Sequence, residues 1–224
     1  LSIVGYNQDT QRDNFTNQTD VTKKFETGSF KHTALLGMEI TRQDSETFRN
    51  TAFFNNATTS VTVPASNPIS TAPITYRQSA SDADSNTDVR VYAGYIQDQI
   101  DITKWLQVTG GLRFDSFEID YHNNRNGTNL SRTDNLVSPR LGVVLKPRED
   151  VSVYSSYSVS YLPSSGDQFS TLTAQTEGLK PEHLENYEIG AKWDINPSFN
   201  VSAAIYQLDR TNTSATDPAD PTRL

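Results

Sequence analysis

The stretch Gly178–Arg210, with the sequence GLKPEHLENYEIGAKWDINPSFNVSAAIYQLDR, decides the fold. Between Leu184 and Asp194 apolar and polar residues alternate, which predicts a strand with one apolar and one polar face. The apolar members are Tyr187, Ile189, Ala191 and Trp193, and the polar members are Glu188, Gly190, Lys192 and Asp194. A turn at Ile195–Phe199 and a returning strand at Asn200–Arg210 follow. This pattern predicts a hairpin of an antiparallel sheet that is apolar on one side and hydrated on the other.

Composition limits the classes of protein that this chain can belong to. Of the 224 residues 34% are hydrophobic and the mean hydropathy is −0.60, so no apolar run approaches the ~20 residues of a membrane-spanning helix. A soluble protein and a transmembrane barrel both fit, because half of each barrel strand and its loops are polar. The net charge of −8 argues against nucleic acid as a partner, and zero cysteines exclude disulfides and thiolate metal sites. No basic and apolar leader precedes Leu1, so we expect a mature form or an internal fragment.

Further strands are predicted by alternation or by short apolar runs, making about nine in all. They are Leu1–Tyr6, Val21–Thr27, Phe30–Arg42, Val89–Ile100, Trp105–Tyr121, Asn135–Lys146 and Val151–Ser160. Short connections are expected at Gly28-Ser29, Asp101–Lys104, Pro147–Asp150 and Ile195–Phe199, and long loops at Asn7–Asp20, Gln43–Asp88, His122–Asp134 and Tyr161–His183. Short and long connections alternate throughout, which is typical of outer-membrane barrels.

The aromatic and charged residues of the predicted strands fit the same geometry. Trp105, Trp193 and Phe199 lie beside short turns, where an interfacial aromatic girdle would be, although core aromatics of a soluble sandwich would also explain them. The polar strand faces carry charges that suit a water-filled lumen or the exposed face of a sandwich. These charges are Arg113, Arg140, Glu188 and Lys192. The predicted fold is therefore all-β: a partial, antiparallel, up-and-down transmembrane β-barrel of about nine strands.

Several sequence blocks, in order and over nearly the whole chain, resemble the barrel of TonB-dependent siderophore receptors, most nearly the catecholate receptors. The blocks are Asn17–Thr22, His32–Glu39, Tyr95–Gln99, Val108–Asp115, Ser138–Gly142, Leu179–Glu182, Asn186–Asp194 and Leu208–Asn212. The match at Leu179–Glu182 and Asn186–Asp194, LKPE and NYEIGAKWD, is the strongest. Each block alone is weak, and the set in this order is specific.

The resemblance implies a 22-stranded barrel closed around an N-terminal plug, in the cell outer membrane of a Gram-negative bacterium. Such a receptor is embedded in outer-membrane lipid, binds a ferric siderophore and imports it with energy from the TonB complex. Residues 1–224 would form one partial barrel domain, with the plug domain, the N-terminal region that contacts TonB and the C-terminal strands absent. The ferric siderophore is the cargo, and no cofactor is expected. An open half-barrel has two unpaired edges, so this piece alone should not transport anything.

The resemblance also suggests where a ligand would bind. An anionic, aromatic chelate favours arginine for charge and tyrosine or phenylalanine for stacking. Candidates near the predicted loops are Tyr76 and Arg77, Tyr121 and Arg125, and Tyr161 and Phe169. The alternative is that they are ordinary exposed loop residues or girdle aromatics.

No residue pattern in the chain predicts catalysis or direct metal binding. His32, His122 and His183 are scattered without HxH or HExxH spacing, and no G-x-S-x-G or paired-carboxylate pattern occurs. We therefore expect no metal ligands and no enzyme activity. Two alternatives to a siderophore receptor stay open. One is a passive outer-membrane pore or autotransporter barrel, and the other is a soluble β-sandwich binding module.

Overall fold

The computed structural model describes residues 1–163 and 172–213. In this part the chain forms eleven strands and one short helix. They are β1 (Ser2–Val4), β2 (Tyr6–Thr27), β3 (Phe30–Phe54), β4 (Ser60–Thr62), β5 (Ile74–Arg77), β6 (Asp84–Asp101), β7 (Leu106–Asn123), β8 (Asn129–Arg148), β9 (Val151–Leu162), α1 (Ala174–Glu177), β10 (Glu182–Asn196) and β11 (Phe199–Thr211).

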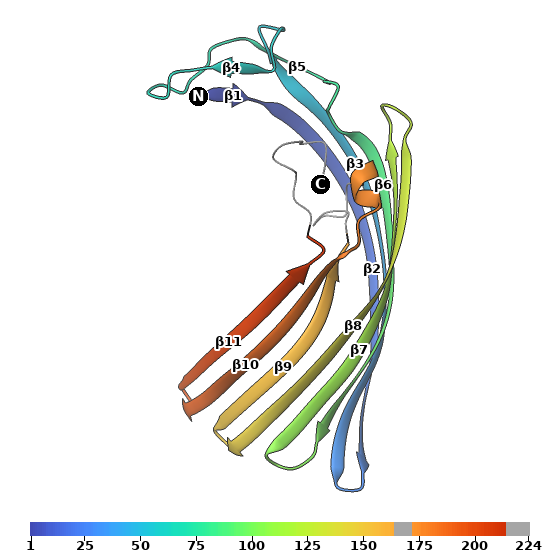
Figure 1. Cartoon of the computed structure of the whole chain (residues 1–224), viewed down its shortest axis with the longest axis vertical. Coiled ribbons are helices and arrows are strands. Elements are labelled where there is room, and N and C mark those ends of the chain that lie inside the picture. Colours follow the sequence, from blue (N-terminus) through green and yellow to red (C-terminus); the bar gives the residue numbers. More distant parts are fainter. Residues whose placement is uncertain (164–171, 214–224) are drawn as a thin grey trace.

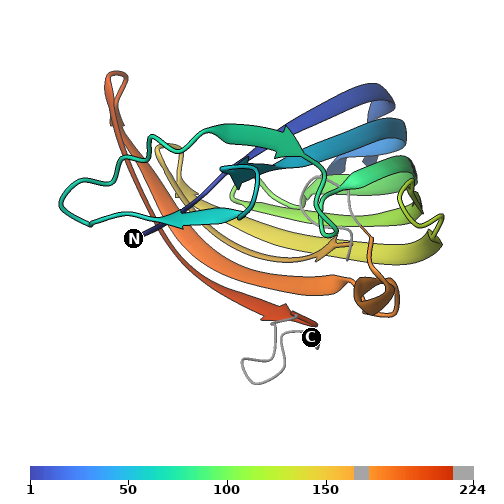
Figure 2. The same cartoon turned by 90° about the horizontal axis from the view of Figure 1, so that it is seen from above.

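Eight long strands form one antiparallel up-and-down sheet in the order β11-β10-β9-β8-β7-β6-β3-β2. The short strand β5 pairs with the far end of β3, and β1 pairs with β4 in a separate two-stranded sheet. The large sheet is a curved open wall with a concave and a convex side (Figure 1), and the view from above shows the same curvature (Figure 2). The predicted class, an all-β antiparallel barrel fragment, is confirmed.

The short connections lie together at one end of the sheet, at the bottom of Figure 1. Gly28-Ser29, Glu149-Asp150 and Pro197-Ser198 form tight turns, and a four-residue turn joins β6 to β7. Gly28 has φ +62°, a left-handed conformation that glycine adopts without steric strain. We call this the turn end and the opposite edge the loop end. The predicted short turns are confirmed.

Three predicted loops were wrong in extent. Residues 7–20 are not a loop, because β2 runs unbroken from Tyr6 and pairs with β3 along its whole length. Likewise β3 continues to Phe54, and β8 begins at Asn129, so that only Asn124–Thr128 connects it to β7. These extensions are mostly polar and lack the sustained alternation of apolar and polar residues that was used to find strands. The predicted strand Leu1–Tyr6 is β1, which lies outside the large sheet.

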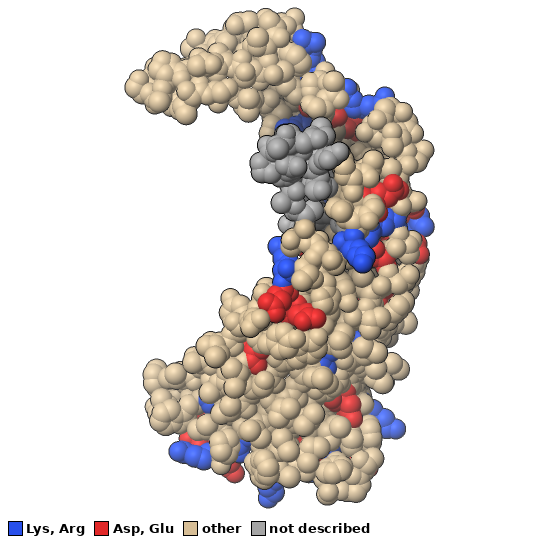
Figure 3. All heavy atoms as spheres, in the orientation of Figure 1, with Lys and Arg blue, Asp and Glu red and all other residues tan. Residues whose placement is uncertain are grey.

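The convex side carries an exposed apolar belt across the strands. Its members are Leu36, Met38, Ile40, Tyr92, Ile96, Leu112, Phe114, Val137, Leu141, Val143, Leu145, Tyr187, Ile189, Trp193, Val201 and Ile205, each 40–73% exposed. Strand pairing places them in register, as in the row Leu36, Ile96 and Leu112. So large a contiguous apolar surface does not stay in water on a monomer. Figure 3 shows charged side chains along the turn end at the bottom and on the loop-end strands.

The main cluster of buried apolar residues lies at the loop end of the concave side. Val89, Phe117, Ile119 and Leu172 form this cluster. Trp105, Trp193 and Phe199 are about half exposed beside the turn end, the position expected for a girdle. No helix in the described ranges is long and apolar enough to cross a membrane.

Candidate functional site: the concave wall and its loop end

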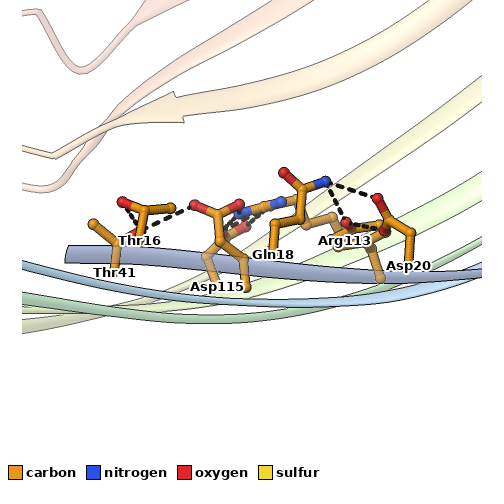
Figure 4. A network of polar contacts seen from close by, with 8 residues as sticks. Thr16, Gln18, Asp20, Thr41, Arg113 and Asp115 are labelled. Carbon is orange, nitrogen blue, oxygen red and sulfur yellow. Dashed lines mark hydrogen bonds and ion pairs between the residues drawn. The ribbon is translucent and has the colours of Figure 1, made fainter.

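A polar network lies on the concave side of β2, β3, β6 and β7 (Figure 4). The Tyr95 hydroxyl donates to Asp20 Oδ1 at 2.5 Å, and Gln18 Nε2 donates to the Tyr95 hydroxyl at 2.7 Å and to Asp20 Oδ2 at 3.1 Å. Tyr95 reaches from β6 across β3 to β2 because Gly37 stands between them. A Cβ on Gly37 would lie 2.2 Å from the Tyr95 ring. The ring therefore lies flat against the wall and leaves the concave side open.

Arg113 is the centre of the second half of this network. Its Nε donates to both oxygens of Asp115, at 2.9 and 3.1 Å, and its Nη2 donates to Glu39 Oε2 at 3.0 Å. Thr41 donates to Glu39 Oε1 at 3.3 Å and to the Thr16 hydroxyl at 3.2 Å. Two carboxylates thus surround one guanidinium, and the bonds between them fix these side chains as a rigid polar surface.

Beside the network the concave wall is hollowed by a cavity of about 760 Å³. Its lining includes Asp20, Glu39, Tyr95, Arg113, Arg140 and Tyr161. Arg140 is exposed on this wall and makes no hydrogen bond or ion pair with any residue in the described ranges. The concave side is therefore polar and charged here, in contrast to the apolar convex side.

At the loop end, Asp82 fixes the long β3–β6 connection to the wall. Its side chain is 3% exposed and accepts from Ser79 N at 2.7 Å, Thr51 Oγ1 at 2.8 Å and Thr51 N at 2.9 Å. Burial raises the pKa of Asp82, but the hydrogen bonds from Ser79 and Thr51 outweigh it and hold the pKa below its ordinary value. Asp82 is therefore an ionised clip that holds the loop in place.

The predicted ligand residues Tyr121, Arg125 and Tyr161 have structural partners. Arg125 Nη1 donates to the backbone oxygens of Ser79 and of Asp82, the latter at 3.2 Å. Tyr121 packs against the buried cluster, and the Tyr161 ring is tilted against the His183 ring at 5.0 Å. Arg125 thus binds the same loop that Asp82 holds in place, whereas Tyr161 lines the cavity further along the wall.

Tyr76 and Arg77 lie on β5, beside the end of β3. The Arg77 guanidinium lies 3.7 Å from the centre of the Phe53 ring and, within the described ranges, makes no hydrogen bond or ion pair. Its N–H donors are therefore available to a ligand. Sequence reasoning missed Phe53 because it assigned the residue to a loop, although FF at 53–54 was an apolar signal. Phe169, the remaining candidate, lies outside the described residues.

No group of three or more His, Cys, Asp or Glu in residues 1–163 and 172–213 is arranged to hold a metal ion. His32 is bonded through Nδ1 to Asp98 and through Nε2 to the Thr27 hydroxyl, each at 2.6 Å, and its ring stacks on Phe25. These contacts occupy both ring nitrogens. The arrangement offers surfaces for recognition, made of arginines, aromatic rings and carboxylates.

Comparison with known proteins identifies relatives over nearly the whole chain. The model of the family described as "TonB dependent receptor-like, beta-barrel" matches residues 2–224. The probable TonB-dependent siderophore receptor PiuA of Acinetobacter baumannii is 29% identical, over 95% of this chain and 31% of its own length. The probable TonB-dependent receptor BfrD of Bordetella pertussis is 31% identical, over 90% and 30%. The catecholate siderophore receptor Fiu of Escherichia coli is 26% identical, over 88% and 29%. The chain thus spans about three tenths of the length of these relatives, which are named as receptors.

Solved structures show the same strand arrangement. The crystal structure of the siderophore receptor PiuA from Acinetobacter baumannii superposes with a TM-score of 0.74 at 25% identity, over 89% of this chain and 32% of that one. The closed form of the ferric-catecholate import receptor Fiu from Escherichia coli gives 0.68 at 25% identity, over 91% and 32%. The ferric citrate transporter FecA, at 17% identity and 0.69, shares the fold.

Proposed function

Because the chain belongs to the TonB-dependent receptor-like β-barrel family, we propose that its parent protein imports a ferric siderophore across the outer membrane of a Gram-negative bacterium. In this proposal the eight long strands of the large sheet are a part of the barrel wall. The observation that carries the proposal is the two-sided sheet. Its convex belt suits lipid, and its charged concave wall suits an aqueous lumen. A soluble sandwich would bury that belt against a second sheet.

The proposed cargo is an anionic, aromatic iron chelate of the catecholate class. Two relatives are named for siderophores, and one of them for catecholates. On this chain the unit that suits such a ligand best is Arg77 stacked on Phe53. The ring holds the guanidinium in place while its N–H donors stay open to an anion. Tyr76, Tyr121, Arg125, Tyr161 and Phe169 stay as proposed contributors to the same vestibule.

Import would draw its energy from the TonB complex, contacted by a part of the parent protein other than residues 1–224. The test is uptake of radioactive iron by a Gram-negative host that lacks its own catecholate receptors and carries the complete coding region. We expect uptake of ferric dihydroxybenzoate in a TonB-competent host and none in a TonB-deficient one. Equal uptake in both hosts would favour a passive pore, and no uptake of any ferric siderophore would refute the proposal.

The role of Arg77 is tested in the same host. Arg77→Ala should weaken ferric-catecholate binding about tenfold or more, because a charge-assisted hydrogen bond is worth ~1.5–3 kcal/mol. Arg90→Ala is the matched control, since Arg90 lies on the convex side and pairs with Asp88 at 2.7 Å. An unchanged dissociation constant for Arg77→Ala would remove Arg77 from the site.

A further inference from the structure

One segment of the β9–β10 connection is folded back onto the concave wall at the loop end. Leu172 is 2% exposed and packs with Val89, Phe117 and Ile119 of the sheet. Two residues on, α1 begins, capped by reciprocal bonds between Thr173 and Thr176. At this end of the wall the helix contacts β8, the strand that carries Ser131 and Arg132. We refer to residues 172–179 as the strap.

A single arginine of β8 holds the other end of the strap. Arg132 is 12% exposed; its Nε and Nη2 each donate to Asp134 at 2.7 Å. Its Nη1 points the other way and donates to the backbone oxygen of Glu177 at 2.5 Å, with that of Thr176 at 3.4 Å. Ser131 N donates to Glu177 Oε1 at 3.2 Å. The two bonds to the Asp134 carboxylate fix the orientation of the Arg132 guanidinium. The nitrogen of Arg132 that bonds to the strap is Nη1.

The strap is attached to the wall by a different kind of contact from those that join the strands. Strands β6, β7 and β8 are joined by continuous ladders of backbone hydrogen bonds. Residues 172–179 pair with no strand, and their contacts with the wall include the buried Leu172 and the side-chain bonds to Thr176 and Glu177. An element held in this way can leave the wall without disturbing the ladders beneath it, which is the property of a locally opening unit.

The chemistry of Nη1 indicates what would release the strap. Its acceptors are neutral carbonyl oxygens, whereas a full anion forms a charge-assisted bond to a guanidinium that is about twice as strong. Because Asp134 keeps the guanidinium in place, an anion can replace the α1 carbonyls without moving Arg132. Removal of the strap would uncover the apolar surface of Val89, Phe117 and Ile119, against which Leu172 packs.

We propose that residues 172–179 are a strap that an anionic ligand releases by taking Arg132 Nη1 from the α1 carbonyls. Arg132 is a positioning residue in the docked state and a ligand contact in the released state. This inference rests on the proposed import of an anionic chelate, and its test separates the two.

The test uses the complete receptor in outer membranes, with Val89→Cys as a reporter. The chain has no cysteine of its own, and Val89 is 1% exposed beneath the strap. The rate of reaction with a membrane-impermeant maleimide then measures how often the strap leaves the wall. Leu172→Ala and Glu177→Ala remove strap contacts without altering the sheet, and Ala174→Ser, on the exposed side of α1, is the matched control.

We expect slow labelling with the strap intact. Labelling should become at least about tenfold faster with Leu172→Ala, because truncating a buried leucine costs more than one tenfold step in an equilibrium constant. Glu177→Ala should also accelerate it, and Ala174→Ser should not. Ferric dihydroxybenzoate should accelerate labelling of the intact strap, and Arg132→Gln should abolish that response.

Two results would overturn the inference. Labelling that is equally slow in Leu172→Ala and in the intact strap would show that Leu172 does not cover Val89. Faster labelling in the strap variants, but no response to a ferric catecholate that the same membranes bind, would refute release by the anion. If the membranes bind no ferric siderophore while the variants still differ, the proposed function fails and the strap alone stands.

Discussion

Replacing Asp82 tests the clip at the loop end most sharply. Asp82→Ala removes three hydrogen bonds to a nearly buried carboxylate and takes this acceptor from the backbone N–H groups of Thr51 and Ser79. Bonds to a charged group contribute ~1.5–3 kcal/mol each, and they are not additive because water reaches an opened surface loop. We expect the free energy of local opening to fall by about 3–5 kcal/mol, which corresponds to two to three orders of magnitude in the opening constant.

The assay is hydrogen exchange of the complete receptor, followed by mass spectrometry of peptides that cover Ser79–Asp84. Exchange there should accelerate in Asp82→Ala and stay unchanged in Ser81→Ala, a matched control whose side chain is exposed. Peptides around Arg113, in the centre of the wall, should not change in either variant. Equal exchange of Ser79–Asp84 in Asp82→Ala and in the unaltered protein would refute the clip.

The same clip gives a pH dependence of known sign. The pKa of Asp82 is lowered on folding, so its stabilisation is complete above the ordinary aspartate value of ~3.9 and is lost as the pH falls through the folded-state pKa. Opening of the loop should therefore increase on acidification below that range. Asp82→Asn should already be open at neutral pH and respond less to acid. A loop that opens on alkalinisation would contradict the assignment.

Two further substitutions test the two sides of the wall. Gly37→Ala should lower the stability of the folded receptor by about 1–3 kcal/mol, because a Cβ at this position overlaps the Tyr95 ring. The melting temperature, measured from heat-modified gel mobility, should fall. An unchanged melting temperature would contradict the packing of Tyr95 on Gly37. Leu112→Arg on the apolar belt should lower the free energy of unfolding in a bilayer by about 2–4 kcal/mol, whereas Gln97→Arg on the concave side should be nearly neutral. Equal effects of the two substitutions on urea unfolding from lipid vesicles would contradict the assignment of one face to lipid and the other to water.

The sheet was predictable where a strand has one apolar and one polar face. Leu184–Asp194 alternates because its Tyr187 side lies on the convex belt and its Glu188 side on the concave wall, and the structure places it in β10. The turns were predictable from their chemistry, as at Gly28-Ser29. Both signals are local, so a single sequence reveals them.

The rest was not predictable because it depends on the partners of each residue. Asn7–Asp20 is polar except for Phe15 and lacks alternation, yet its backbone pairs with β3 residue by residue, which satisfies the N–H and C=O groups that face β3 whatever the side chains are. The candidate site depends on contacts between distant residues in the same way. Arg125 and Arg77 look equivalent in sequence, but the first is bound to the Ser79–Asp82 loop and the second is open on Phe53.

The central claim is that one side of this sheet faces lipid and the other faces water. The most direct measurement places single spin labels at Leu112→Cys and Gln97→Cys in the receptor in lipid vesicles and compares their accessibility to oxygen and to a water-soluble nickel chelate. These residues are on opposite faces of adjacent strands. Oxygen should reach the label at 112 preferentially, and the nickel chelate should not. The label at 97 should be less accessible to oxygen and more accessible to the nickel chelate than the label at 112, because it lies in a polar environment. Exclusion of both reagents from the label at 112 would mean that the belt packs against protein, as in a sandwich, and would contradict the account.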